Sequence, residues 1–257
     1  MQSNVRSATL SPRMCLLIVL AGVDPAFPVV VAGNRDEQRA RPSAPPGLFV
    51  GLNRRMLSPR DRRAGGTWLA VSDRGMVAGL TNLAGVPRRA GARSRGELPH
   101  LALDQADVGA AVEAVRTAAE RTVFDGFQLV VSDGLHTRVL VHRDGRIEEH
   151  DIAGGSVVIS NEHRIGELGL PGLDAACAEG LSVEDRFAAL AVLLLDTGAS
   201  SGHRVLKRGG DYGTVSSSLI AIPRGDIRGL RWRFAPGQPD EVPYREYGNL
   251  ARRLVEV

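Results

Sequence analysis

Short runs of apolar and β-branched residues, separated by turn-forming residues, dominate the pattern of this chain. Two such runs, at residues 14–23 and 28–33, flank Asp24-Pro25 and predict a β-hairpin. Asp-Gly and other Gly-containing turns between later runs predict further antiparallel pairs. The strands expected from these runs are residues 67–71, 76–81, 127–131, 138–141, a short segment around 147, 157–160, 217–222 and 227–234.

Two segments carry apolar residues at helical spacing instead. Residues 107–122 and 183–196 each place an apolar stripe on one face. Ser182, with Asp185 three residues later, gives the second segment a capping signal. Helical blocks between strand blocks favour an α+β fold in which helices cover antiparallel sheets. Without repeats or a low-complexity linker, residues 14–257 are expected to form a single domain.

The N-terminal segment allows two interpretations. Residues 1–13 are polar and lack apolar periodicity, which predicts a disordered leader. A basic leader before an apolar run also fits a secretory signal, but no Ala-x-Ala cleavage site follows it. No apolar stretch reaches the ~20 residues of a transmembrane segment. With only two cysteines, a reducing compartment is favoured, and we expect a cytoplasmic protein.

Composition and charge narrow the classes of partner. A hydrophobic fraction of 43% excludes a disordered chain, and an aromatic fraction of 4% argues against a nucleic-acid partner bound by base stacking. The net charge is only +3, yet residues 54–95 hold ten arginines against two aspartates. Such a basic segment indicates an anionic small-molecule ligand or substrate, or else a set of solvated loops. The oligomeric state is left open.

Motifs for metals and resident cofactors are absent from the sequence. The six histidines never occur four residues apart on a plausible helix, and no paired cysteines exist. Residues 64–67 are glycine-rich but lack the lysine and the following helix of a phosphate-binding loop. We therefore predict no metal and no cofactor.

Cys15 is the strongest candidate for chemistry. If translation starts at Met14, removal of that methionine leaves Cys15 at the N-terminus. Its thiol and α-amine, with reference pKa values of about 8.5 and 7.7–8.0, would then supply nucleophile and base in one residue. With residues 1–14 attached, the nitrogen is an amide and cannot act as a base. The alternative is a structural cysteine that opens an apolar strand, and Cys177 is expected to be a small buried residue.

Polar residues follow several predicted strands. Asn34 to Glu37 close the second apolar run and are expected at a turn, where Arg35 can hold a thiolate or an anionic ligand. Asp36 can anchor an α-ammonium or orient Arg35. Asn82 and Asn161, each at a strand end, can direct an amide N–H at a developing oxyanion. The alternative for each residue is an ordinary solvated turn.

Six collinear blocks carry a family resemblance. They resemble the NRDE family, named for its Asn-Arg-Asp-Glu motif, which includes the transport and Golgi organisation protein 2 group. The blocks are residues 14–19, 32–37 with 40–45, 64–69 with 80–82, 94–98, 159–161 and 212–217.

The resemblance implies a fold and a set of roles. It implies an N-terminal-nucleophile hydrolase-like αββα sandwich, in which two antiparallel sheets lie between helical layers. Cys15 matches the nucleophile, Arg35 the charged partner near the thiol, and Asn82 and Asn161 the amine or oxyanion contacts. Asp36 matches less securely, because the Arg–Asp spacing differs within the wider hydrolase group. The chain departs from the family at Val215, where an arginine is usual, and this puts hydrolysis in doubt.

Two functions follow from the resemblance. One is a cysteine amidohydrolase that cleaves a linear amide C–N bond of an unknown substrate. The other is a non-catalytic carrier of an anionic ligand, such as haem or an acyl-CoA, held by the basic segment 54–95. In the carrier, His100 or Cys15 would be the candidate axial ligand of a haem.

Overall fold

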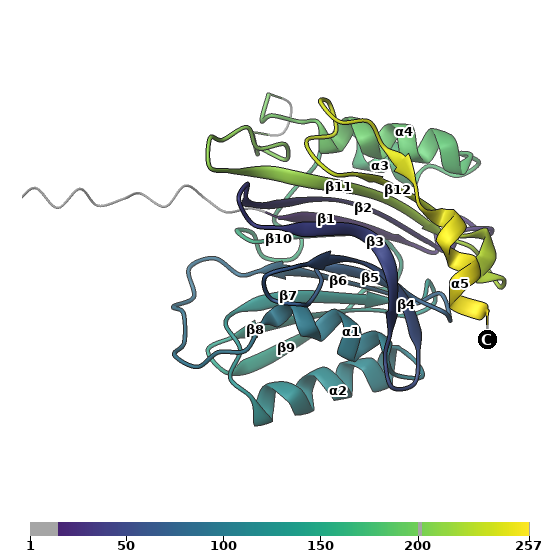
Figure 1. The fold of residues 1–257 in the computed structure, drawn as a ribbon. Coiled ribbons are helices and arrows are strands. Elements are labelled where there is room, and N and C mark those ends of the chain that lie inside the picture. Colours follow the sequence, from purple (N-terminus) through teal and green to yellow (C-terminus); the bar gives the residue numbers. More distant parts are fainter. Residues whose placement is uncertain (1–14, 200–201, 257) are drawn as a thin grey trace, which may run out of the picture.

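Two antiparallel β-sheets form the centre of the structure and pack face to face (Figure 1). The computed structural model describes residues 15–199 and 202–256. The leader expected at residues 1–13, and Met14, lie outside the described residues.

The first sheet has six strands and contains the N-terminal hairpin. Its order is β10-β1-β2-β11-β12-β13, and the register of the hairpin pairs Leu16 with Asn34. The apolar run predicted as the first strand forms β1, which is buried along its whole length. The strands are β1 (Leu16–Ala21), β2 (Val29–Gln38), β10 (Gly155–Ser160), β11 (Tyr212–Ile222), β12 (Arg231–Ala235) and β13 (Arg245–Glu246).

The second sheet has seven strands in the order in which they occur along the chain. Each strand pairs antiparallel with the next, so short turns suffice to connect most of them. The strands are β3 (Ser43–Val50), β4 (Arg55–Asp61), β5 (Leu69–Ser72), β6 (Val77–Asn82), β7 (Phe127–Ser132), β8 (Thr137–Arg143) and β9 (Arg146–Asp151).

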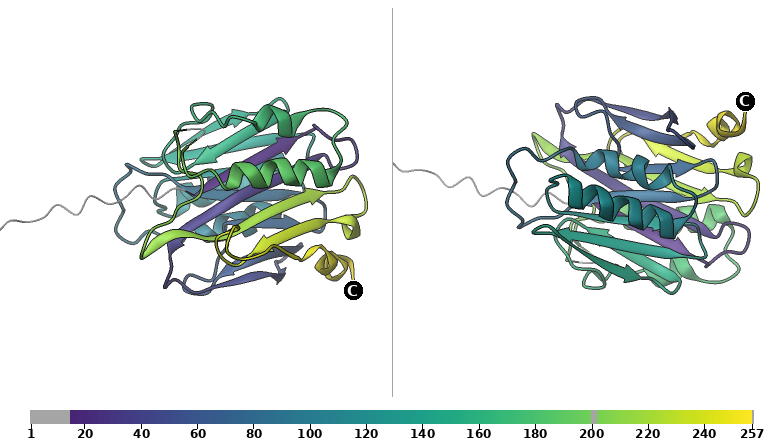
Figure 2. Two further views of the ribbon diagram at one scale, coloured as in Figure 1. Left: turned by 90° about the horizontal axis from the view of Figure 1, so that it is seen from above. Right: turned by 90° about the horizontal axis from the view of Figure 1, so that it is seen from below.

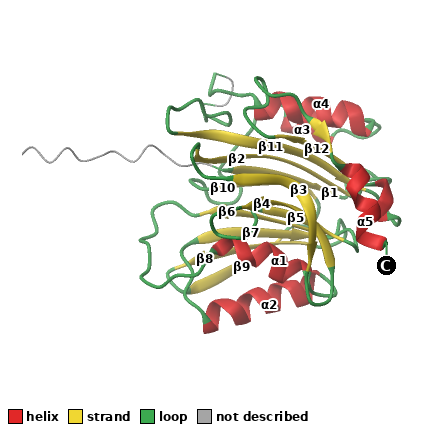
Figure 3. Ribbon diagram, viewed as in Figure 1, coloured by secondary structure: helices red, strands yellow, loops and turns green. Residues whose placement is uncertain are grey.

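Helices cover the outer faces of both sheets, which gives four layers (Figures 2 and 3). Helices α3 (Leu173–Cys177) and α4 (Val183–Leu194) pack on the six-stranded sheet through one apolar cluster. Helices α1 (Leu98–Leu103) and α2 (Val108–Arg121) pack on the seven-stranded sheet through another. A third cluster, which includes Trp232, fills the space between the sheets. The expected αββα sandwich is therefore confirmed.

Both helices predicted from periodicity are confirmed as α2 and α4. The Asp107 side chain caps α2 by accepting from Ala110 N, and Ser182 caps α4 by accepting from Asp185 N. The remaining helical segments are α5 (Arg252–Val255) and the 3-10 turns η1 (Arg95–Glu97), η2 (Ile227–Gly229) and η3 (Gly248–Ala251). Over the described part of the chain, no helix combines the length and apolar character needed to cross a membrane.

Two expected local structures are wrong. The Asn34–Glu37 segment does not form a turn, because β11 pairs with β2 as far as Gln38 and keeps it extended. Residues 227–234 do not form one strand, because η2 comes first and only β12 continues as a strand. The fold also contains β3, β4, α1 and α3, which the apolar pattern did not predict.

The two sheets approach closely beneath the start of β1. A Cβ atom on Gly33 would lie 2.7 Å from Leu17 Cδ1, and one on Gly79 would lie 2.1 Å from Leu17 Cδ2. The two glycines therefore leave room for the Leu17 side chain between β2 and β6. This contact fixes Cys15, two residues earlier, at the end of the interface between the sheets.

Candidate active site

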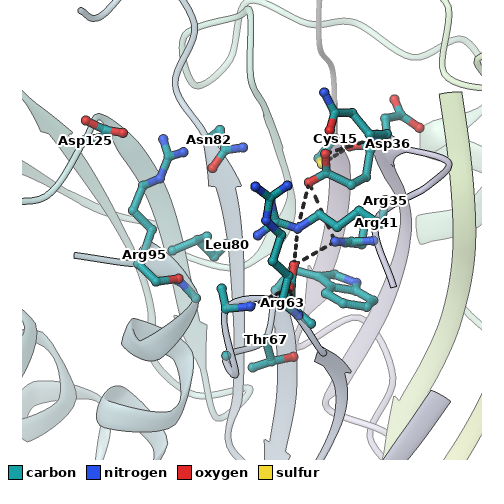
Figure 4. A pocket seen from close by; sticks show the side chains of 18 of the residues that line it. Cys15, Arg35, Asp36, Arg41, Arg63, Thr67, Leu80, Asn82, Arg95 and Asp125 are labelled. Atoms are coloured by element: carbon teal, nitrogen blue, oxygen red, sulfur yellow. Dashed lines mark hydrogen bonds and ion pairs between the residues drawn. The ribbon is translucent and has the colours of Figure 1, made fainter. Parts of the chain in front are cut away.

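A polar cavity of about 600 Å³ opens at the end of the two sheets where β1 begins (Figure 4). One wall comes from Cys15 and the polar end of β2. The other comes from the end of β6 and from the loop of residues 83–94 with η1. The cavity thus lies between the two sheets, and both contribute side chains to it.

Cys15 lies on the first wall, directly before β1. Continuing the β1–β2 register by one residue places Cys15 opposite Arg35. Its Sγ donates to the main-chain oxygen of Asp36 at 3.4 Å. Burial, reinforced by the nearby Asp36 carboxylate, raises the pKa of the Cys15 thiol to about 12, although the Arg35 charge opposes the shift. In this state the thiol is therefore neutral at pH 7.

Asp36 is a buried carboxyl group with one oxygen unused. Its Oδ1 accepts from Thr214 Oγ1 at 2.7 Å, while Oδ2 is buried and has no hydrogen-bond partner among the described residues. Burial raises the pKa of Asp36 to about 7, even though the Thr214 hydrogen bond and the Lys207 charge act in the opposite direction. A cation beside Oδ2 would relieve this unfavourable burial.

Arg35 is held rigidly by its neighbours. It is 5% exposed, its Nη2 lies 3.0 Å from Asp61 Oδ2, and its guanidinium stacks 4.3 Å from the centroid of Trp68. Asp61 also accepts from Arg41 Nε at 2.6 Å. Burial alone would raise the pKa of Asp61, but the Arg41 hydrogen bond and the two arginine charges hold it below its usual value. Arg35 therefore acts within a fixed charge network beside the thiol.

A β-bulge lies in β11, beside β2, at the position of Val215. Thr214 pairs with Asp36 and Ser216 with Arg35, so Val215 is the extra residue between them. Lys207, the chain's only lysine, lies near this bulge. Its Nζ is 3.9 Å from Glu162 Oε1, and its charge acts on Asp36. A positive charge thus acts on the Cys15 and Asp36 side chains although position 215 has none.

The two candidate asparagines differ in position. Asn82 ends β6 and lines the cavity, across from Cys15 (Figure 4). Asn161 follows β10, is 2% exposed, and its main-chain oxygen accepts from Ala84 N at 2.7 Å. It is not among the residues that line the cavity. The structure therefore brings Cys15, Arg35, Asp36 and Asn82 to one cavity, and Asn161 is not part of its lining.

The basic segment 54–95 divides between the cavity and the outer surface. Arg63, Arg88, Arg93 and Arg95 line the cavity, and the other six arginines of the segment do not. Part of the segment therefore forms a wall of the cavity, and the rest carries arginines that lie outside it.

His100 is not placed to serve as an axial ligand in this cavity. It is 8% exposed, stacks on Phe49 and hydrogen-bonds to Ser58 Oγ at 2.9 Å, away from the cavity lining. Burial lowers the pKa of His100 to about 4. Within residues 15–199 and 202–256, no group of three or more His, Cys, Asp or Glu side chains is arranged to hold a metal ion. Cys177 is partly exposed in α3 rather than fully buried.

Sequence reasoning missed several residues of the site. Asp61, Thr214, Lys207 and Arg95 were not singled out, although each contacts or lines the site. The single lysine was a usable signal, because a lone Lys among 31 arginines is unusual. Arg95 and Thr214 lie within the matched blocks 94–98 and 212–217, but their roles, like that of Asp61, depend on contacts between distant segments.

Comparison with known proteins gives a family and a fold. The model of the family "Transport and Golgi organisation 2" matches residues 14–168. The "Transport and Golgi organization protein 2 homolog" of Bos taurus and that of Homo sapiens are each 37% identical over 111 residues. These alignments cover 42% of this chain and only 40% of each relative.

Two solved structures of low sequence identity resemble this chain. The N-acylethanolamine-hydrolyzing acid amidase ortholog of Caenorhabditis elegans has a TM-score of 0.53 at 10% identity, over 80% of this chain and 92% of that one. A mutant of the conjugated bile acid hydrolase from Clostridium perfringens has a TM-score of 0.47 at 10% identity, over 91% and 94% of the two chains. The likeness to the first places this chain in the N-terminal-nucleophile hydrolase-like fold.

Proposed function

This chain belongs to the Transport and Golgi organisation 2 family, and we propose that it is a cysteine amide hydrolase whose nucleophile is an N-terminal Cys15. One observation carries the proposal: the Cys15 thiol and the buried Asp36 carboxyl group share a wall of the cavity, and Asp36 Oδ2 has no partner among the described residues. A free α-ammonium on residue 15 would add a positive charge next to Asp36, beyond the Lys207 charge that already acts on this carboxyl group.

The proposed reaction uses groups of this chain alone. The α-amine of Cys15 takes the thiol proton, and the thiolate attacks the carbonyl carbon of the substrate amide. Asn82 donates its side-chain N–H to the oxyanion of the tetrahedral intermediate. When the C–N bond breaks, the α-ammonium gives its proton to the leaving amine, and a thioester remains on Cys15. Water then hydrolyses the thioester to a carboxylic acid and restores the thiol.

In this proposal, the chain that retains residues 1–14 is inactive because of the same geometry. With Met14 attached, the nitrogen of Cys15 is an amide, and the thiol, with a pKa of about 12, stays protonated at pH 7. Removing residues 1–14 would place a positive charge beside the thiol and lower its pKa toward the reference value of about 8.5. Exposure of Cys15 is therefore the activating step.

The test compares two forms of the protein, one with residues 1–257 and one expressed from Met14 so that Cys15 becomes the N-terminus. Both are treated with 4-nitrophenyl acetate, and the acetyl adduct is located by peptide mass spectrometry. We expect acetylation of Cys15 at least about a hundredfold faster in the shorter form, because its thiolate fraction is larger.

Two variants of the shorter form complete the test. Cys15→Ala should abolish the fast acetylation, whereas Cys177→Ala should leave it unchanged. Equal rates in the two forms, or fast labelling that survives Cys15→Ala, would count against the proposal. Mass spectrometry of the N-terminus of the naturally produced protein then shows which form exists in its source.

A second candidate function is a carrier for an anionic small molecule. It is favoured by Arg63, Arg88 and Arg95, which line the cavity and form no ion pair with any described carboxylate. In a carrier that holds its ligand through these arginines, Cys15→Ala would leave ligand binding intact, and the protein would not hydrolyse amides. Turnover of an amide by the shorter form, lost in Cys15→Ala, would exclude this alternative.

A further inference from the structure

We propose that Arg95 and Arg88 form an oxyanion-recognition subsite, so that the molecule bound beside Cys15 carries a carboxylate or phosphate group at its other end. The inference deepens the proposed function, because it assigns the part of the substrate that the far wall of the same cavity recognises. It rests on that function only for the position of the reacting amide.

The arginines that line the cavity differ in whether a nearby carboxylate neutralises them. Arg35 and Arg41 share Asp61 at 3.0 and 2.6 Å, and both lie within 4 Å of Glu37. On the far wall, Arg93 pairs with Glu97 at 2.5 Å.

Arg88 and Arg95 are not neutralised in this way. Neither forms an ion pair with a described residue, although the Asp125 carboxylate is close enough for its charge to act on Arg95. The Asp125 Oδ1 atom accepts from the main-chain N–H of Arg89 at 2.8 Å, and Asp125 forms no ion pair with either arginine. The far wall therefore presents two positive charges that no ion pair with a described residue satisfies.

Contacts between distant segments hold Arg95 in place. Its Nη1 donates to the main-chain oxygen of Gly126 at 2.6 Å, which leaves its other N–H groups for a ligand. The same oxygen accepts from Leu83 N at 3.0 Å, so both ends of the loop are attached to one carbonyl group. Figure 4 shows the Arg95 side chain rising from the wall opposite Cys15 and ending between Asn82 and Asp125.

Two glycine-containing motifs make this placement possible. Thr67 N donates to Gly96 O at 2.8 Å, and a Cβ atom on Gly66 would lie only 2.3 Å from that same oxygen. Residues 64–69 and 94–98 can therefore cross in contact only without a side chain at position 66. The chain at this crossing directs Arg95 into the cavity. Residues 64–69 and 94–98 therefore position Arg95, a role that is separate from the reaction at Cys15.

An oxyanion is the ligand chemistry that this wall fits. Arg95 is partly buried, and burial lowers its pKa; the Asp125 carboxylate opposes this shift and the like charge of Arg88 adds to it. A carboxylate or phosphate would offset the burial and the repulsion at once, and a guanidinium presents paired N–H donors that match both groups. A neutral ligand of the same shape would do neither.

The experiment measures binding to the 1–257 chain by isothermal titration calorimetry. The probes are inorganic phosphate and succinate, with the neutral succinamide as the control for shape. We expect binding of at least one oxyanion, weakened by salt, and no binding of succinamide. The stronger of the two oxyanions identifies which group the subsite takes.

Variants then locate the binding. Arg95→Gln should weaken oxyanion binding about ten- to a hundredfold, as expected for the loss of a charge-assisted hydrogen-bonded contact. Arg88→Gln, an exposed position, provides a second test if Arg95→Gln impairs folding. Arg74→Gln is the matched control, because it removes an equal charge from the same basic segment outside the cavity lining.

The outcomes separate this inference from the proposed hydrolysis. Failure to bind either oxyanion, or an equal loss in Arg74→Gln and in both cavity variants, overturns the subsite. If oxyanions bind as expected but the shorter form is not acetylated, the hydrolysis fails and the subsite stands. If acetylation occurs without oxyanion binding, the reverse holds. Cys15→Ser should keep the oxyanion binding and lose the acetylation.

Discussion

The two walls of the cavity are built in opposite ways. The wall on β2 consists of buried polar groups, with Arg35 at 5% and Asp36 at 3% exposure, held by partners from β4 and β11. The opposite wall consists largely of exposed arginines on the loop after β6, of which Arg88 has no ion pair among the described residues. One wall is fixed by the fold, and the other leaves its charges available to a ligand.

This difference separates two tasks. A reacting thiol needs neighbours whose positions do not change, because misplacement by about 1 Å costs rate. Recognition of a charged group needs donors that are still unused when the ligand arrives. The β2 wall therefore suits the chemistry proposed at Cys15, and the loop wall suits selection of the bound molecule.

The largest expected effect is a difference in stability between two variants, each of which lacks one arginine from one of the two walls. Arg35→Met should lower the free energy of unfolding by about 3 kcal/mol, because it breaks a buried ion pair with Asp61 and leaves that carboxylate with fewer partners. Arg88→Gln should change the free energy of unfolding by less than about 0.5 kcal/mol, because it alters an exposed side chain. Urea denaturation of the parent and the two variants at pH 7 measures both values. Similar losses in the two variants would remove the contrast between the walls.

Local pattern was sufficient for much of the fold. Apolar runs flanking a turn predicted the β1–β2 hairpin, and apolar stripes predicted α2 and α4, because such elements are specified by neighbouring residues and bury one face. The pattern failed for β3, where Pro45 and Pro46 interrupt the run. That strand is tolerated at the edge of its sheet, where a missing N–H donor breaks no ladder.

The site was harder to predict than the fold. Asn34–Glu37 has the composition of a turn, yet it is extended and mostly buried because β11, from a distant part of the chain, supplies partners for it. The placement of Arg95 likewise depends on the crossing of Gly66 and Gly96, two residues that lie far apart in the sequence. The positions of the motifs alone identified the cavity residues of β2 and Asn82, whereas Asn161 matched a motif and does not line the cavity.

The pH dependence of stability tests whether Asp36, on the β2 wall, is buried as a neutral carboxyl group. Burial raises the pKa of this carboxyl group from 3.8 to about 7, so between these values the folded state holds a proton that the unfolded state has lost. This contribution to stability is present at low pH and declines as the pH rises from about 4 to about 7. Asp36→Asn cannot ionise and should keep the hydrogen bond from Thr214 through its side-chain oxygen.

The variant should therefore gain stability relative to the parent between pH 5 and pH 7, by about 2 kcal/mol. Urea denaturation of both 1–257 chains at the two pH values measures this gain. Asp125→Asn, which removes a carboxylate from the opposite wall, is the control. A stability difference that does not depend on pH would contradict the burial of Asp36. In the chain that begins at Cys15 the gain should shrink, because an α-ammonium beside Asp36 favours its ionised form.

The smallest effect is expected from the ion pair on the loop wall. Arg93 and Glu97 are 2.5 Å apart, but the arginine side chain is 62% exposed, so water and salt screen most of the attraction. A double-mutant cycle with Arg93→Gln and Glu97→Gln should give a coupling energy of about 0.5 kcal/mol or less at roughly physiological salt. Chemical denaturation of the four proteins measures it, and repeating the cycle at about 1 M salt should abolish it. A coupling well above about 1 kcal/mol, the upper end for exposed pairs, would mean that this wall is also fixed by the fold. The division of tasks between the walls would then have to be abandoned.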